Sequence, residues 1–131
     1  MVKKRILVID DEASVTRSIT LNLEALRVYE VRPENDARAA LQTAREFRPD
    51  LVLLDIMMPE LDGGDIAAQL QEDPLLKDTP IVFLTAIVSK EETKGREAQI
   101  GGMNYLAKPV DLAELTRVIE AHLKGRRETP R

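Results

Sequence analysis

LVLLDIMMPELDG, residues 51–63, is the stretch that decides the fold. It begins with four apolar residues, Leu51 to Leu54, which lead directly into one carboxylate, Asp55, and it ends in a turn-forming Asp-Gly pair. A short unbroken apolar run followed by turn signals is typical of a strand that is buried on both faces, as strands of parallel sheets are. A carboxylate at the carboxyl end of such a strand lies where open α/β sheets bind their ligands. Asp55 is therefore the first candidate for a reactive group.

The composition fits one globular domain without thiolate or multi-histidine sites. The chain has 131 residues, of which 44% are hydrophobic and 32% are charged, as is typical of a single soluble domain. It has no cysteine and one histidine, His122, which excludes disulfides and metal sites built from several thiolates or imidazoles. No apolar run is long enough for a signal-peptide core or a membrane span, so we expect a cytoplasmic protein with no membrane partner. The formal net charge of −4 argues against non-specific DNA binding.

Strand-like and helix-like segments alternate five times along the chain. Short apolar runs predict strands at residues 5–9, 29–31, 51–54, 81–84 and 103–106. Apolar residues at helical spacing, or capping signals, predict a helix after each of these strands. This alternation predicts an α/β fold with a parallel sheet, right-handed crossovers and five helices divided between its two faces.

Two of the predicted helices have notable features. Asn35 or Asp36 can cap the second helix, because both side chains can accept a hydrogen bond from an exposed backbone amide. The fourth helix, predicted from Ser89 to Ile100, has almost no apolar stripe and contains Gly95. An interior glycine costs about 1 kcal/mol relative to alanine. We therefore expect the fourth helix to be held least firmly on the sheet.

Polar side chains stand at the carboxyl ends of four predicted strands, and parallel strands bring these ends to one side of a sheet. The residues are Asp10 and Asp11, Asp55, Thr85 and Lys108. Three carboxylates in one crevice demand a cation, and oxygen ligands alone favour Mg²⁺, with Mn²⁺ as the alternative. A carboxylate beside a metal, an ammonium and a hydroxyl can attack phosphorus, as aspartyl-phosphate chemistry does. The metal and Lys108 would then neutralise the phosphoryl oxygens, and Thr85 could bond one of them.

Four separate motifs carry a family resemblance. They are Ile9-Asp10-Asp11-Glu12, Leu54–Pro59 with Asp62-Gly63, Leu84-Thr85-Ala86, and Tyr105–Pro109. With these motifs in this order, about residues 4–123 resemble the receiver domain of two-component response regulators, the CheY-like superfamily. The resemblance implies a flavodoxin-like three-layer fold with strand order 2-1-3-4-5. It divides the chain into a receiver domain, residues 1–124, and a charged C-terminal tail, residues 125–131.

The resemblance also implies a phosphorylation mechanism. Asp55 would accept a phosphoryl group from the phosphohistidine of a sensor histidine kinase or of a histidine phosphotransfer protein. Asp11 and Asp55 would bind Mg²⁺ directly together with the Met57 carbonyl, and Asp10 would act through water. The protein would catalyse only its own phosphorylation and dephosphorylation, and in that sense we do not expect an enzyme.

The switch implied by the resemblance involves three further residues. Lys108 would contact the phosphoryl group. The peptide bond between Lys108 and Pro109 could be cis. Thr85 would move toward the phosphoryl group and Tyr105 would swing inward, which changes the surface formed by the fourth helix, the fifth strand and the fifth helix. That surface would control a downstream protein target rather than DNA directly. A monomer or a phosphorylation-dependent homodimer is expected, although the fourth helix lacks the charged pattern of the family's DNA-binding branch.

Two departures from the usual family pattern bear on the site. Gly64 replaces a common apolar residue and could loosen the start of the third helix. In the family, the residues two beyond the acceptor and two beyond the threonine influence hydrolysis of the phosphoryl group. Here they are Met57 and Ile87, and neither side chain can orient a water molecule. We therefore predict a long-lived phosphoryl group.

Three alternative functions compete with that of a phosphorylated receiver domain. A metal-dependent phosphatase using Asp55 as nucleophile would need a second catalytic acid, but Met57 stands where it would be, and no cap-sized insertion exists. A receiver-like interaction module that does not depend on phosphorylation would not need the intact acid, threonine and lysine set. The third alternative is that this chain is one domain of a larger regulator or hybrid kinase, since the sequence stops after the fifth predicted helix. If the chain is complete, its output is expected through protein contacts.

Overall fold

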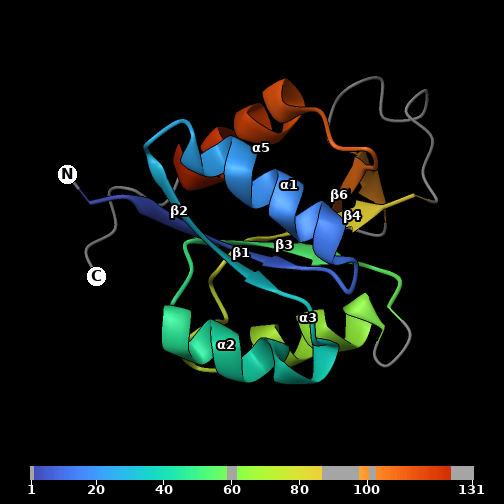
Figure 1. Ribbon diagram of the computed structural model, residues 1–131. Helices are drawn as coiled ribbons and strands as arrows, with labels where there is room; N and C mark the ends of the chain where they lie inside the picture. The colour runs from blue at the N-terminus through green and yellow to red at the C-terminus, as the bar shows by residue number, and fades with distance from the viewer. Residues whose placement is uncertain (1, 59–61, 87–97, 101–102, 125–131) are drawn as a thin grey trace.

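The protein folds into a sheet flanked by helices (Figure 1). The computed structural model describes residues 2–58, 62–86, 98–100 and 103–124. The strands are β1 (Lys4–Ile9), β2 (Tyr29–Glu34), β3 (Leu51–Asp55), β4 (Ile81–Thr85), β5 (Ala98–Ile100) and β6 (Met103–Ala107). The helices are α1 (Ala13–Glu24), α2 (Ala40–Phe47), α3 (Gly63–Glu72) and α5 (Leu112–Lys124), and a short 3-10 helix, η1 (Ala37–Ala39), precedes α2.

Five of the strands form the predicted parallel sheet. β1 pairs with β2 and β3, β3 with β4, and β4 with β6, in each case in parallel. The predicted order 2-1-3-4-5 is therefore confirmed, with β6 as the fifth predicted strand. Helices α1 and α5 cover one face of the sheet and α2 and α3 cover the other (Figure 1). None of the described helices is long and apolar enough to cross a membrane.

Strand β3 is buried on both faces, as its sequence predicts. Leu51 and Leu53 pack in the cluster beneath α1 and α5, whereas Val52 and Leu54 pack in the cluster beneath α2 and α3. Each of these four side chains is at most 1% exposed. Because β3 lies at the centre of the sheet, the position of Asp55 is fixed by a strand that is packed on both faces.

The predicted helix from Ser89 to Ile100 is wrong over its last three residues, and the prediction of a sheet with only five strands is wrong. Ala98–Ile100 form β5, which pairs antiparallel with β6 and adds a sixth strand at the edge of the sheet. The described residues contain four α-helices rather than five, and residues 87–97 lie outside them. The weak apolar stripe gives a helix little to bury, and only two residues separate Ile100 from Met103, a length that suits a hairpin.

The end of β2 decides which residue caps the next helix. The Asp36 carboxylate accepts a hydrogen bond from Arg38 N at 2.9 Å and so caps η1. The side chain of Asn35 has other partners, described below. Strand β2 continues through Pro33, which an edge strand tolerates because it can place the missing amide on its unpaired side.

The first residue of α3 lies directly against the end of β3, and only glycine fits there. A Cβ on Gly63 would lie 2.5 Å from the Asp55 carbonyl oxygen and 2.7 Å from Ile56 Cα. We expect Gly63→Ala to lower the free energy of unfolding by about 2 kcal/mol, the cost of overpacking a fixed backbone contact. Urea denaturation of wild type and variant measures this difference.

The neighbouring glycine provides a matched control. Among the described residues, a Cβ on Gly64 would meet the Asp62 carboxylate, with Oδ1 at 3.4 Å and Cγ at 4.0 Å. Gly64→Ala is expected to leave stability unchanged or to raise it by up to about 1 kcal/mol, because alanine favours helix. If both variants shifted the urea midpoint equally, close packing of α3 on β3 would not be the reason for the glycine.

Candidate functional site

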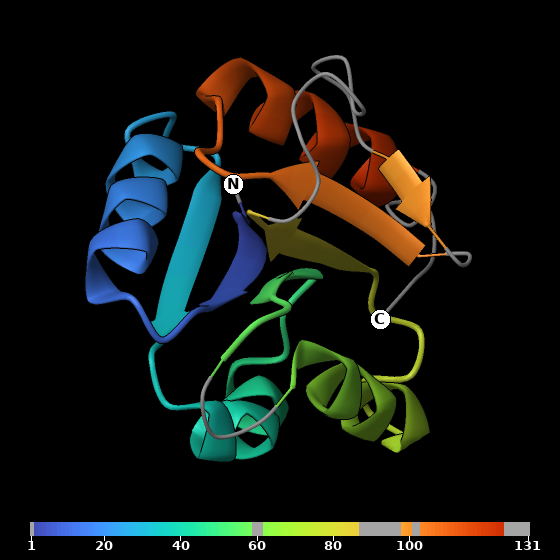
Figure 2. The ribbon, with the colours of Figure 1, turned by 90° about the vertical axis from the view of Figure 1, so that its right-hand side faces the viewer.

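The carboxyl ends of the parallel strands meet on one side of the molecule, which faces the viewer in Figure 2. Asp55 ends β3, Thr85 ends β4, Asp10 follows β1, and Lys108 follows β6. Asp10 is completely buried, and Thr85 and Asp55 are 2% and 4% exposed. The structure thus brings together, at one end of the sheet, residues that lie far apart in the sequence.

The ammonium group of Lys108 lies among three carboxylates. Lys108 Nζ is 2.8 Å from Asp10 Oδ2, 3.3 Å from Asp55 Oδ1 and 3.7 Å from Glu12 Oε1. Only 16% of the Lys108 side chain is exposed, so its ion pairs with the buried Asp10 and Asp55 are shielded from bulk solvent, whereas the Glu12 side chain is 63% exposed. The ammonium therefore neutralises part of the negative charge that the strand ends collect.

The backbone around Lys108 explains how its side chain reaches Asp55 from a strand that is not adjacent to β3. Lys108 N donates to the Thr85 carbonyl oxygen at 2.9 Å, which continues the pairing of β6 with β4 by one residue. The peptide bond between Lys108 and Pro109 is cis, as the resemblance implies.

Burial and charge shift the protonation equilibria of Asp55 and Lys108. Burial raises the pKa of Asp55 to about 6, the charge of Asp10 adds to the rise, and the Lys108 ammonium opposes it. Burial would lower the pKa of Lys108, but its contacts with Asp10 and Asp55 outweigh burial and raise this pKa above its usual value. Asp55 is therefore largely ionised, and Lys108 is charged, at neutral and mildly alkaline pH.

Three carboxylates at this end of the sheet can hold a metal ion. Asp10, Asp11 and Asp55 each offer a carboxylate oxygen, and these oxygens lie within 4.8 Å of one another. Asp10 and Asp55 are buried, whereas Asp11 is exposed. One ammonium cannot balance three carboxylates, and the donors are oxygen atoms only. The donor set therefore fits a hard divalent cation such as Mg²⁺ or Mn²⁺.

Comparison with known proteins identifies the family. The sequence matches the family model of the response regulator receiver domain over residues 6–120. The chain belongs to this family. It is 36% identical to the alkaline phosphatase synthesis transcriptional regulatory protein PhoP of Bacillus subtilis over 121 residues. These residues cover 92% of this chain and 49% of PhoP. It is 42% identical over 127 residues to the response regulator MprA of Mycolicibacterium vanbaalenii, which is 96% of this chain and 52% of MprA.

A solved structure agrees with this assignment. The chemotaxis protein CheY4 of Vibrio cholerae superimposes with a TM-score of 0.78 at 28% sequence identity, covering 93% of this chain and 100% of CheY4. The resemblance to the CheY-like receiver family and to its fold is thereby confirmed. This receiver domain spans about half the length of the curated relatives it matches.

The two predicted switch residues of the receiver domain lie on neighbouring strands. Thr85 is buried at the end of β4, and Tyr105 is half-buried on β6. The Tyr105 ring stacks on Phe83, with 5.2 Å between the ring centroids and 26° between the planes. The movements of Thr85 and Tyr105 stay predictions.

Met57, two residues beyond Asp55, lies at the rim of a surface depression beside the acidic cluster. The side chain of Met57 is 64% exposed, and its backbone N–H lies 3.4 Å from Asp55 Oδ1. The depression is lined by Asp11, Glu12, Ile56, Met57, Met58 and Asp62. The predicted roles of the Met57 carbonyl as a metal ligand and of Ile87, which lies outside the described residues, stay predictions.

Two residues that the sequence does not predict to belong to the receiver site are placed there by the structure. Glu12, part of the first motif, extends its carboxylate to within 3.7 Å of Lys108. Asn35, considered only as a helix cap, donates to the Asp10 carbonyl oxygen at 2.7 Å. The position of Glu12 next to Asp10 and Asp11 in the sequence could have indicated its contact. The Asn35 contact could not be predicted in this way, because it depends on how β2 ends beside β1.

Proposed function

We propose that this receiver domain is a phosphorylation-dependent switch whose phosphoacceptor is Asp55. The observation that carries the proposal is the ion pair between Lys108 and Asp55, 3.3 Å apart, at the open end of the sheet. A fixed ammonium in a shielded position can neutralise the charge of an incoming phosphoryl group. The pKa of about 6 keeps Asp55 ionised near neutral pH and more nucleophilic than an ordinary carboxylate.

In the proposed reaction, one Asp55 carboxylate oxygen attacks the phosphorus of a phosphohistidine. The new O–P bond forms as the P–N bond breaks, and the imidazole leaves with the bonding electron pair and takes a proton from solvent. Asp10, Asp11 and Asp55 would hold Mg²⁺, or Mn²⁺ in its place, with the Met57 carbonyl as an additional ligand. The divalent ion, when bound, supplies positive charge to the phosphoryl oxygens. Thr85 would then bond the phosphoryl group, and Tyr105 would move inward to alter the β6–α5 surface.

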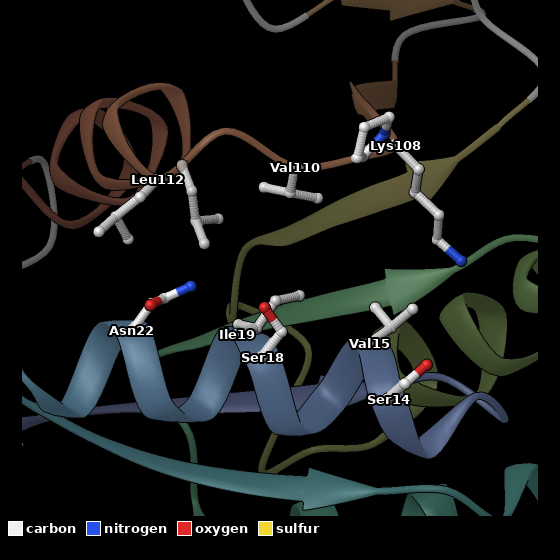
Figure 3. Close-up of a pocket in the computed structure, with 10 residues that line it drawn as sticks. Ser14, Val15, Ser18, Ile19, Asn22, Lys108, Val110 and Leu112 are labelled. Carbon is white, nitrogen blue, oxygen red and sulfur yellow. The ribbon is translucent and has the colours of Figure 1, made fainter.

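A groove between α1 and α5 supports a protein as the phosphodonor. The groove is lined by Ser14, Val15, Ser18, Ile19, Asn22, Lys108, Pro109, Val110, Leu112 and Leu115 (Figure 3). Its wall from α1 is uncharged, its opposite wall is apolar, and Lys108 links it to Asp55. We propose that a helix of a sensor histidine kinase, or of a histidine phosphotransfer protein, occupies this groove and presents its phosphohistidine at Asp55.

The proposal is tested by measuring intact mass after incubation with Mg²⁺ and acetyl phosphate. We expect a gain of one phosphoryl group in the wild type, and no gain with EDTA or in Asp55→Asn. Absence of the gain under all conditions would instead support an interaction module that works without phosphorylation. The switch would turn over no external substrate, and we place it in the cytoplasm, where its phosphodonor would be.

The side chain of Met57 gives a prediction about phosphoryl lifetime. Met57→Asn places an amide that can orient water at the rim of the depression beside Asp55. We expect the phosphoryl group to be lost about tenfold faster, a change of roughly 1.4 kcal/mol in the barrier. The measurement is the decay of phosphorylated protein by intact mass after removal of acetyl phosphate. Met57→Leu, which cannot bond water, is the control, and equal lifetimes for both variants would contradict the prediction.

A second candidate output is DNA binding by a longer protein. Relatives such as PhoP are named transcriptional regulatory proteins, and this chain spans 49% of PhoP. We propose that a neighbouring domain would then bind DNA under control of the receiver. The mass of the natural protein in its source cells separates the two outputs. A mass near 14.7 kDa leaves protein contacts as the output, whereas about twice that mass favours the longer regulator.

A further inference from the structure

One amide nitrogen, Asn35 Nδ2, joins the end of β1 to the first turn of α1. Asn35 directly follows β2 at the surface of the molecule. Its Nδ2 lies 2.7 Å from the Asp10 carbonyl oxygen and 2.9 Å from Thr16 Oγ1. A carbonyl oxygen can only accept, so the nitrogen of the amide must face it, and the two hydrogens of the amide match the two acceptors.

The buried hydroxyl of Thr16 continues this connection into α1. Thr16 is 2% exposed and donates to the Ala13 carbonyl oxygen at 3.1 Å, which leaves a lone pair to accept from Asn35. Residues 10–12 form the loop that carries the carboxylates of Asp10 and Asp11. The bonds from Asn35 therefore close this loop across its base.

Asn35 starts from a fixed position because both of its sequence neighbours are held. The Glu34 carbonyl accepts from Asp10 N at 3.1 Å. The Glu34 carboxylate accepts from Thr43 Oγ1 at 2.5 Å and from Asp36 N at 3.0 Å. A side chain that projects from such a restrained segment can in turn restrain the loop that it contacts.

The loop needs restraint because its carboxylates repel one another. The oxygens of Asp10, Asp11 and Asp55 lie within 4.8 Å, and Lys108 offers one positive charge among them. Without a cation, opening of the loop would relieve this repulsion. A cation would then have to draw the loop back, and that work would weaken its binding. A loop that is held in place avoids this cost.

We propose that Asn35 is a positioning residue for the divalent cation. Its amide holds the loop bearing Asp10 and Asp11 in the cation-binding arrangement without contacting the ion itself. The inference rests on the metal site of the proposed function and adds a residue from outside the acidic cluster. Loss of a supporting contact of this kind typically weakens metal affinity about 10–100-fold.

The test measures Mg²⁺ affinity by calorimetry on unphosphorylated protein, well below the melting temperature of every variant. Asn35→Ala is expected to raise the Mg²⁺ dissociation constant about tenfold. Asn35→Asp keeps the size but replaces the donor with an oxygen that faces the Asp10 carbonyl. It is also expected to weaken binding, although its added negative charge alone would strengthen it.

Gln42→Ala is the matched control. It removes a side-chain amide whose nitrogen donates to Glu46 Oε2 at 2.8 Å on the exposed side of α2, a hydrogen bond that does not involve the Asp10 loop or the residues that hold Asn35. It is expected to leave the Mg²⁺ dissociation constant unchanged. If both Asn35 variants bound Mg²⁺ as tightly as the wild type, or if Gln42→Ala weakened binding equally, the inference would be wrong. Failure of the wild type itself to bind Mg²⁺ or accept phosphate would instead overturn the proposed function.

Discussion

Lys108→Met is expected to slow phosphorylation of Asp55 by acetyl phosphate about 100-fold or more at saturating Mg²⁺, the usual cost of losing one fixed electrostatic contact to a reacting group. Methionine preserves much of the length and all of the apolar character of the side chain while removing its charge. The lost group is the only ammonium that the described structure places within 4 Å of Asp55. The rate of mass gain, measured over a range of acetyl phosphate concentrations, gives the size of the effect.

The loss of Lys108 acts on Asp55 in two ways. The ammonium compensates charge on the phosphoryl oxygens during transfer. It also opposes the effects of burial and of Asp10 on the pKa of Asp55, so its removal raises this pKa further above about 6. A larger fraction of Asp55 is then protonated near neutral pH and cannot attack phosphorus. At limiting Mg²⁺, where protonation of Asp55 competes with cation binding, the deficit of Lys108→Met is therefore expected to be larger at pH 6.5 than at pH 8.5.

Two further variants separate charge from geometry. Lys108→Arg keeps the positive charge but replaces a compact ammonium by a planar guanidinium, and we expect an intermediate rate. Lys77→Met removes a lysine from the exposed segment after α3 and is expected to react as the wild type does. A rate for Lys108→Met within fivefold of the wild type would show that the ammonium does not assist the transfer.

The sequence predicts the central part of this fold because burial there is unambiguous. β3 is apolar at every position before Asp55, and the structure divides those residues between two cores. Once the parallel order is known, the meeting of Asp10, Asp55 and Lys108 follows from the direction of the strands. The segment from Ser89 to Ile100 offers no comparable signal. With few apolar residues to bury, its sequence does not distinguish a helix from the short antiparallel strand β5.

The finer contacts of the site depend on side-chain directions that a sequence does not contain. Sequence reasoning treats Asn35 and Asp36 as equivalent caps because both are short polar residues. The end of β2 turns Asp36 toward η1 and Asn35 toward Asp10. Lys108 was expected to serve the phosphoryl group on Asp55, yet its shorter contact is with Asp10, at 2.8 Å.

Asp55→Asn is expected to stabilise the metal-free protein at pH 8 by on the order of 3 kcal/mol, because each unit of pKa shift corresponds to about 1.4 kcal/mol. The pKa of Asp55 is raised from 3.8 to about 6 by burial first and by the charge of Asp10 second. Above pH 6 the wild type must therefore keep an unfavourable charge in the folded state. Asparagine has nearly the same shape and carries no charge, so it removes this cost.

The sign of the pH dependence follows from the two pKa values. Between pH 3.8 and about 6 the folded state holds a proton on Asp55 that the unfolded state releases. The contribution of Asp55 to stability is therefore most favourable at low pH and is lost as the pH rises to about 6. The advantage of Asp55→Asn should fall to about half at pH 5 and to about one-fifth at pH 4. Urea denaturation of both proteins at pH 4, 5 and 8 measures this trend.

Mg²⁺ and a surface control decide whether charge is the cause. Asp65→Asn removes an exposed carboxylate from the first turn of α3 and is expected to change stability by less than about 0.5 kcal/mol. Mg²⁺ should stabilise the wild type more than Asp55→Asn, because only the wild type keeps the Asp55 carboxylate as a candidate ligand of the ion. A ligand that binds only the folded state stabilises it more, the higher the ligand concentration is relative to the dissociation constant. The gap at pH 8 should therefore narrow as Mg²⁺ is added. If the difference in the free energy of unfolding stayed constant with both pH and Mg²⁺, the stabilisation would come from better packing of asparagine. The buried negative charge of Asp55 would then not be its cause.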